Sequence, residues 1–106
     1  MSFFQRLSNW FSQSGREDNL LQQAVDLAKE KRPADAIAIY NDLLRSNSAT
    51  STVRARALFN RALAYSSLKD DERAVADLQS VISSNDAPEN VRTAARTQLV
   101  RLKNRA

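Results

Sequence analysis

Apolar residues recur along this chain at the spacing of one helix face, and two such stretches are near copies of each other. The copies start at residues 36 and 74, which lie 38 positions apart. In each copy, steps of three and four residues place the apolar side chains on one side of an α-helix. The matching pairs are Ala36 with Ala74, Ile37 with Val75, Tyr40 with Leu78, Leu43 with Val81, and Leu44 with Ile82.

The segments before these two stretches match at the same distance. Each copy is therefore predicted to be a pair of antiparallel helices. Hairpins that repeat in this way bury their apolar faces against neighbouring hairpins. The pattern predicts an all-α fold, a short α-solenoid of two hairpins. The matched positions of the first helices are Leu20, Ala24 and Leu27, which lie 38 before Leu58, Ala62 and Tyr65.

Turn-forming residues set the expected limits of the helices. Pro33 and Pro88 suit first turns, where the missing N–H of proline is not needed. Residues 46–52 form a polar loop with hydroxyls that can cap the next helix, and Asp70 or Asp71 can cap the one after it. The expected helices span residues 18–31, 33–45, 52–68 and 71–84, and a C-terminal capping helix ends near residue 103.

A separate apolar stripe lies at the N-terminus. Residues 2–13 are predicted to form an amphipathic helix, and residues 14–16 read as a breaker and short linker because they contain the only glycine. We therefore divide the chain into an N-terminal segment, residues 1–16, and a helical domain, residues 17–106. The stripe consists of Phe3, Phe4, Leu7, Trp10 and Phe11.

Three interpretations of this stripe remain open at the level of the sequence. It packs on its own hairpins, as a cap or in the groove between them, as most apolar stripes do. Alternatively, it contacts a second copy, giving a homodimer, or another protein, since a large exposed apolar patch favours association. Finally, it lies in a membrane surface, where Trp and Phe are at home, although Arg6 is the only basic residue on its polar face.

Composition argues against catalysis. The chain has no cysteine and no histidine, which removes thiolate metal sites, disulfides and the commonest general base. No glycine-rich phosphate loop or nucleophile elbow is present. We therefore expect a non-enzymatic protein without a cofactor. No apolar run of membrane-spanning length and no signal peptide occurs, so we expect a cytoplasmic location, with membrane association as the alternative.

The net charge of +4 is concentrated near the C-terminus. Arg92 and Arg96 lie four residues apart and share one face of the last helix. A basic stripe attracts phosphates, but no aromatic interleaving or base-reading motif accompanies it. We therefore do not expect nucleic-acid binding, and we interpret the charges as the polar outer face of a terminal helix.

The second copy resembles a tetratricopeptide repeat (TPR). The family pattern has a large apolar, a small and a tyrosine position on the first helix, followed by alanine, a large residue and an aliphatic pair on the second. The family's turn glycine is replaced by charged residues in both copies, and the 38-residue spacing exceeds the usual 34. The positions that carry the resemblance are Leu58, Ala62, Tyr65, Ala74, Leu78, Val81 and Ile82, with Ala36, Tyr40, Leu43 and Leu44 in the first copy.

The resemblance implies a protein-interaction module that binds a peptide or helix in a groove lined by the first helices. For Leu21, Val25 and Leu63, contact with neighbouring helices is the competing interpretation. Asn60 matches one position of the carboxylate clamp found in some TPR proteins, but Leu21 and Val25 occupy two others, so we do not expect a clamp. The predicted groove residues are Leu21, Val25, Arg56, Phe59, Asn60, Leu63 and Ser66.

Overall fold

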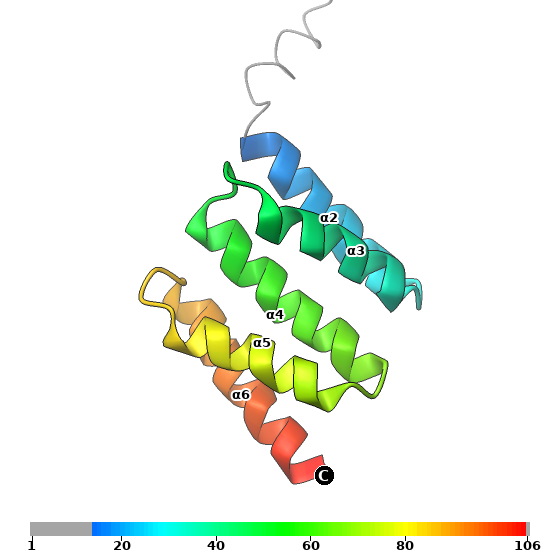
Figure 1. Cartoon of the computed structure of the whole chain (residues 1–106). Helices are drawn as coiled ribbons and strands as arrows, with labels where there is room; N and C mark the ends of the chain where they lie inside the picture. The colour runs from blue at the N-terminus through cyan, green and yellow to red at the C-terminus, as the bar shows by residue number, and fades with distance from the viewer. Residues whose placement is uncertain (1–13, 106) are drawn as a thin grey trace, which may run out of the picture.

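The computed structural model describes residues 14–105, and these residues form helices joined by short turns. α2 (Ser14–Lys29) and α3 (Pro33–Arg45) make the first hairpin, and α4 (Ser51–Ser67) and α5 (Asp71–Ser83) make the second. α6 (Glu89–Arg105) follows alone, as the helices stack in chain order (Figure 1). Within the described residues there is no strand, and the prediction of an all-α helical repeat is confirmed for them. None of these helices combines the length and apolar character needed to cross a membrane.

The helices form two layers. α2, α4 and α6 contact one another in turn and make one layer, to which we refer as the first helices. α3 packs between α2 and α4, and α5 packs between α4 and α6, so these second helices make the other layer. Each hairpin is thereby held to the next through its second helix, as an α-solenoid requires.

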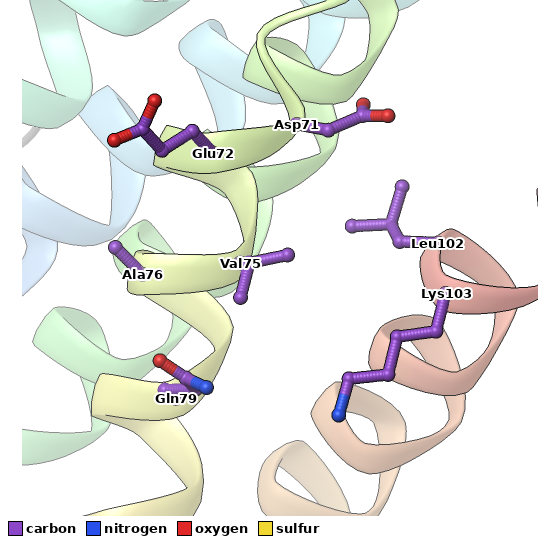
Figure 2. A pocket seen from close by; sticks show the side chains of 7 residues that line it. All are labelled: Asp71, Glu72, Val75, Ala76, Gln79, Leu102 and Lys103. Atoms are coloured by element: carbon purple, nitrogen blue, oxygen red, sulfur yellow. The ribbon is translucent and has the colours of Figure 1, made fainter. Parts of the chain in front are cut away.

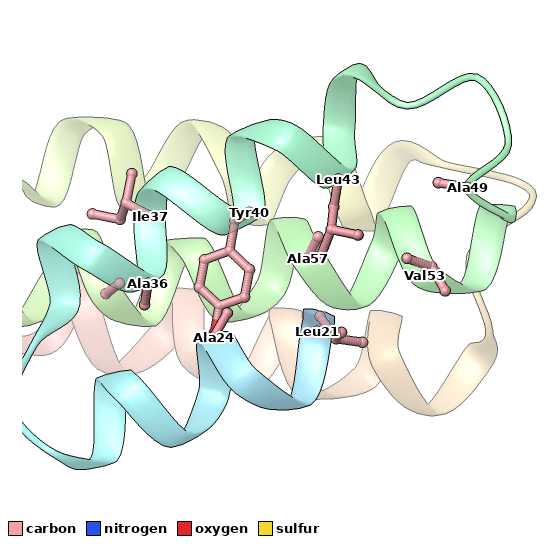
Figure 3. Close-up of a cluster of buried hydrophobic side chains, with 10 residues drawn as sticks. Leu21, Ala24, Ala36, Ile37, Tyr40, Leu43, Ala49, Val53 and Ala57 are labelled. Carbon is pink, nitrogen blue, oxygen red and sulfur yellow. The ribbon is translucent and has the colours of Figure 1, made fainter. Parts of the chain in front are cut away.

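Two apolar clusters fill the space between the layers. The first surrounds Tyr40 and Leu43 of α3, each 1% exposed, and Figure 3 shows the Tyr40 ring reaching from α3 towards Ala24 of α2. The second surrounds Leu78 and Val81 of α5, which are fully buried. Both clusters use the stripes predicted from the sequence, so the repeated pattern marks the core of each hairpin.

Both hairpins turn in the same way although neither has a glycine at the turn. Lys31 and Lys69, 38 positions apart, have φ angles of 64° and 66°. At the first turn, the N–H of Arg32 donates to the carbonyl of Leu27 at 2.9 Å, and Asp70 makes the matching bond at the second turn. Such a bond to the fifth residue back, donated by the residue that follows a left-handed residue, is the Schellman ending of a helix.

Glycine at either turn is expected to stabilise the protein. A residue with a β-carbon is strained at positive φ, so Lys69→Gly or Lys31→Gly should raise the free energy of unfolding by about 0.5–1 kcal/mol. Thermal melts followed by circular dichroism measure this change. The control is Lys29→Gly, which places glycine at a helical position and should instead lower stability. Equal effects of Lys29→Gly and Lys31→Gly would contradict this explanation of the turns.

The start of α2 differs from the prediction. Residues 14–16 do not form a linker, because α2 begins at Ser14 and runs through Gly15 and Arg16. One contact that holds this first turn is made by Glu17, which is buried and accepts hydrogen bonds from the hydroxyls of Ser46 and Ser48 in the inter-repeat loop. The predicted helix over residues 2–13, with all its apolar residues, lies outside the described residues.

The inter-repeat loop is fixed from α4 as well. Arg54 donates to the backbone carbonyls of Leu44, Ser46 and Ala49, at 3.2, 2.6 and 3.3 Å. The Thr50 hydroxyl accepts the N–H of Val53 at 3.1 Å and caps α4. The predicted cap of α5 is also present, as the Asp70 carboxylate accepts the N–H of Arg73 at 3.2 Å. The longer loop behind the 38-residue spacing is thus a bonded part of the domain.

Candidate binding face of the first helices

Three alanines fix the rotational register of the first helices. Ala24 of α2, Ala62 of α4 and Ala95 of α6 are 0%, 1% and 0% exposed, so each faces neighbouring helices. Residues one position after and three positions before each alanine lie on the same side of each helix. α2, α4 and α6 are neighbours in that order, so these positions line up across them (Figure 1).

This alignment defines one surface, the first-helix face. All seven predicted groove residues lie on it, and the buried Ala95 places Arg92 and Arg96 of the predicted basic face there too. The rows across α2, α4 and α6 are therefore Leu21, Phe59, Arg92 and Val25, Leu63, Arg96.

Two of the predicted residues are buried. Leu21 is 7% exposed and belongs to the first apolar cluster. Ser66 is 8% exposed, and its hydroxyl receives a hydrogen bond from the Arg105 guanidinium at 3.3 Å. Leu21 and Ser66 therefore contribute to packing between helices, and the open part of the face is smaller than the sequence suggested.

The open part over α2 and α4 is largely apolar. Leu63 is 36% exposed, while Val25 and Phe59 are half-buried. Asn60 is also half-buried, and its amide donates to the carbonyl of Arg56 one turn earlier at 2.8 Å. That bond leaves the carbonyl oxygen of the Asn60 side chain without a bond inside this turn. Exposed Arg56 borders the apolar area.

The part over α6 is basic. Arg92 and Arg96 both bind the carboxylate of Glu89, Arg96 at 3.5 Å. In addition, the Nε of Arg92 is buried and has no hydrogen-bond partner. A buried donor without a partner is energetically costly. Two guanidinium groups thus share one carboxylate, and a further carboxylate could reach the exposed donors of Arg96.

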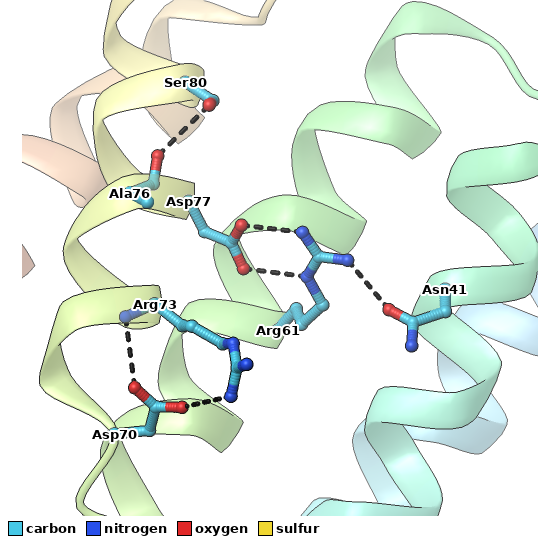
Figure 4. A network of polar contacts seen from close by, with 7 residues as sticks. All are labelled: Asn41, Arg61, Asp70, Arg73, Ala76, Asp77 and Ser80. Carbon is cyan, nitrogen blue, oxygen red and sulfur yellow. Dashed lines mark hydrogen bonds and ion pairs between the residues drawn. The ribbon is translucent and has the colours of Figure 1, made fainter.

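A polar network missed by the sequence analysis ties the two hairpins together on the other side of α4. Arg61 donates to both carboxylate oxygens of Asp77 in α5, at 2.8 and 2.7 Å, and to the side-chain oxygen of Asn41 in α3 at 2.8 Å (Figure 4). The hydrogen bond to Asp77 raises the pKa of Arg61, outweighing the opposite effect of burial. The guanidinium also lies 5.6 Å from the centre of the Tyr65 ring.

Comparison with known proteins supports the repeat. Residues 56–86 match the family model of the tetratricopeptide repeat, which covers most of α4, all of α5 and the following turn. No curated protein and no solved structure matches the chain significantly. The first hairpin repeats the same core positions and the same turn 38 residues earlier. The matched segment is therefore a TPR-like repeat, and the described residues as a whole form a helical repeat.

Proposed function

We propose that the chain is a non-enzymatic protein-interaction module whose first-helix face binds a peptide or helix of another protein. TPR-like repeats act in general as protein-interaction modules. The observation that carries the proposal is the order of side chains across the face. Across this face, apolar residues lie on α2 and α4, and guanidinium groups lie beside them on α6.

This order fits a ligand of matching composition. Val25, Phe59 and Leu63 would take large apolar side chains, which gain free energy by leaving water. Arg92 and Arg96 would bind a carboxylate that lies next to these apolar side chains in the ligand, because bonds between guanidinium and carboxylate groups are strong and directional. The proposed ligand is therefore a segment with two or more apolar residues next to acidic ones.

Selection from a random peptide library displayed on phage tests this function. The enriched peptides are expected to combine large apolar and acidic residues. Leu63→Ser and Arg96→Glu should each weaken their binding by about tenfold or more, as central contacts of an interface do. Fluorescence anisotropy of a labelled enriched peptide measures the change.

Arg101→Glu is the matched control, because Arg101 is exposed on the side of α6 that faces away from the first-helix face. It changes the net charge by the same amount as Arg96→Glu and should leave affinity nearly unchanged. Enriched peptides that ignore both Leu63→Ser and Arg96→Glu would overturn the proposal. So would an equal loss of affinity in Arg101→Glu, which would indicate attraction by net charge alone.

A further inference from the structure

A second surface, distinct from the first-helix face, lies between α5 and α6. It is a hollow of about 510 Å³, and the apolar residues of its lining are Val75, Ala76 and Leu102 (Figure 2). Figure 2 shows Val75 and Leu102 pointing towards each other from the two helices, whereas Glu72 and Ala76 point away from α6 in this view. Exposed Ala76 and half-buried Val75 leave apolar surface in contact with water.

The first hairpin shows how such a surface is covered. Ile37, the counterpart of Val75, is only 9% exposed. Asn41, the counterpart of Gln79 in the hollow, is bonded through Arg61 to Asp77 of α5. In the first hairpin, therefore, Ile37 is covered within the cluster of α2, α3 and α4, and Arg61 of α4 lies between Asn41 and Asp77. Within the described residues, α6 packs against α5 but leaves Val75 half-buried and Ala76 exposed.

The N-terminal stripe has the spacing of these second helices. Phe3, Phe4, Leu7, Trp10 and Phe11 occupy relative positions 0, 1, 4, 7 and 8. The core stripes that begin at Ala36 in α3 and Ala74 in α5 occupy the same relative positions. We propose that residues 2–13 of a second copy of this chain dock as a helix in the hollow between α5 and α6.

The connection to α2 favours a second copy over the same chain. In the structure, a second helix leads into the next first helix through five residues, 46–50 in one case and 84–88 in the other. α2 begins at Ser14, so a helix over residues 2–13 has no residues left for such a turn. The hollow also lies near the C-terminal end of α6, at the opposite end of the stack from Ser14 (Figure 1).

The surface of α2 that is nearest in sequence is poorly suited to an aromatic stripe. Its exposed side is a shallow hollow in which Leu27 is the only apolar residue, alongside Asn19, Gln22, Gln23, Asp26 and Glu30. Burying these polar groups under phenylalanine rings would leave them without hydrogen-bond partners. In contrast, the hollow at α5 and α6 has three apolar residues in its lining, Val75, Ala76 and Leu102. Its exposed Glu72 can pair with Arg6, the only charged residue of the segment.

An interface of this kind is heterologous. One copy contributes its N-terminal segment and the other contributes its α5–α6 hollow, so the same contact can repeat from copy to copy. Such contacts produce open chains or closed rings rather than a symmetric pair. Each copy keeps its first-helix face free, because the hollow lies on other residues.

Two complementary variants of the full chain test the proposal. Ala76→Arg blocks the hollow at an exposed position and keeps an intact segment, whereas Trp10→Glu spoils the segment and keeps an intact hollow. Trp10 is the only tryptophan, so in a mixture all tryptophan fluorescence comes from the segment of the Ala76→Arg chain. Ala38→Arg is the control, since Ala38 is the exposed counterpart of Ala76 in α3.

Sedimentation velocity of the unmodified chain should show a mass that rises with concentration, and Ala38→Arg should behave in the same way. Ala76→Arg and Trp10→Glu should each remain monomeric, with association weakened by about tenfold or more. An equimolar mixture of the two should form a dimer that cannot grow, with a blue shift of tryptophan emission. The proposal is overturned if the unmodified chain stays monomeric, if the mixture stays monomeric, or if Ala38→Arg and Ala76→Arg lose association equally.

Discussion

Replacing Tyr40 with alanine is expected to lower the free energy of unfolding by about 3–5 kcal/mol, the usual result of removing a buried aromatic side chain. Tyr40 is 1% exposed, and its ring occupies the space between α2, α3 and α4. Small domains have total stabilities of about 5–15 kcal/mol, so this loss is a large fraction of the total. Urea unfolding followed by circular dichroism measures the difference.

Tyr40→Phe separates the ring from its hydroxyl and serves as the control. It keeps the packing, so at neutral pH its stability should stay within about 1 kcal/mol of the unmodified protein. Burial raises the pKa of Tyr40 to about 12, compared with 10.0 for a free tyrosine. Above pH 10 the unfolded chain therefore loses this proton first, and stability falls until about pH 12.

The loss through Tyr40 over this interval should reach about 2–3 kcal/mol, and Tyr40→Phe should not show it. Other groups titrate in both proteins and cancel in the comparison. Parallel stability curves for the two proteins between pH 9 and 12 would show that Tyr40 is not buried in this way. A tolerated Tyr40→Ala substitution would contradict the packing of the first hairpin.

Removing the Asp77 carboxylate is the second substitution with a large expected effect. Asp77→Ala should lower the free energy of unfolding by about 2–4 kcal/mol, because it leaves the Arg61 guanidinium partly buried without its counter-charge. The side chains of Arg61 and Asp77 are 21% and 8% exposed, so water replaces the lost contact poorly. The loss should appear in the same urea experiment.

Two comparisons make this prediction specific. Asp42→Ala removes an ion pair with Arg45 that is open to water, since the side chains of Arg45 and Asp42 are 74% and 70% exposed. This substitution should lower the free energy of unfolding by less than about 1 kcal/mol. The double variant Arg61→Met with Asp77→Leu removes both charges, and it should be more stable than Asp77→Ala alone. Equal losses in Asp42→Ala and Asp77→Ala would contradict a role for the network in joining the hairpins.

The apolar pattern was sufficient to predict the repeat, because burial against neighbouring helices imposes it directly on the sequence. Tyr40 and Leu78 occupy equivalent positions and are both buried in the structure. Asp70 was also predictable as a cap, since capping depends on residues only three positions apart. The equivalent helix positions of Ala24 and Ala62 were predictable as well, because the 38-residue repeat pairs these two residues.

Contacts between distant polar residues could not be predicted in this way. Arg61 and Asp77 are separated by 16 positions, and nothing local shows that their side chains converge. The predicted start of α2, at residue 18, was wrong for a related reason. Gly15 is a poor helix former, but the contacts of Glu17 with Ser46 and Ser48, about 30 residues away, help to stabilise this turn. Local propensity is a weak guide where tertiary contacts of this kind exist.

The candidate site was predictable in its position on the helices, but its open area was not. Leu21 and Leu63 lie on the same side of their helices, yet Leu21 is buried and Leu63 is exposed. The difference depends on how neighbouring helices pack. The side of α6 that carries Arg92 and Arg96 likewise became clear only from the burial of Ala95.

Amide NMR of the full chain, titrated with a peptide enriched in the selection described above, tests the proposed function most directly. The largest shift changes are expected at Val25, Phe59, Asn60, Leu63 and Arg96, which line the first-helix face. Self-association through the α5–α6 hollow would instead affect Val75 and Ala76. Binding on the first-helix face would be contradicted if the signals of Phe59 and Leu63 in α4 did not shift. In that case the shift changes would be confined to the hollow or to the solvent-exposed side of α3 and α5.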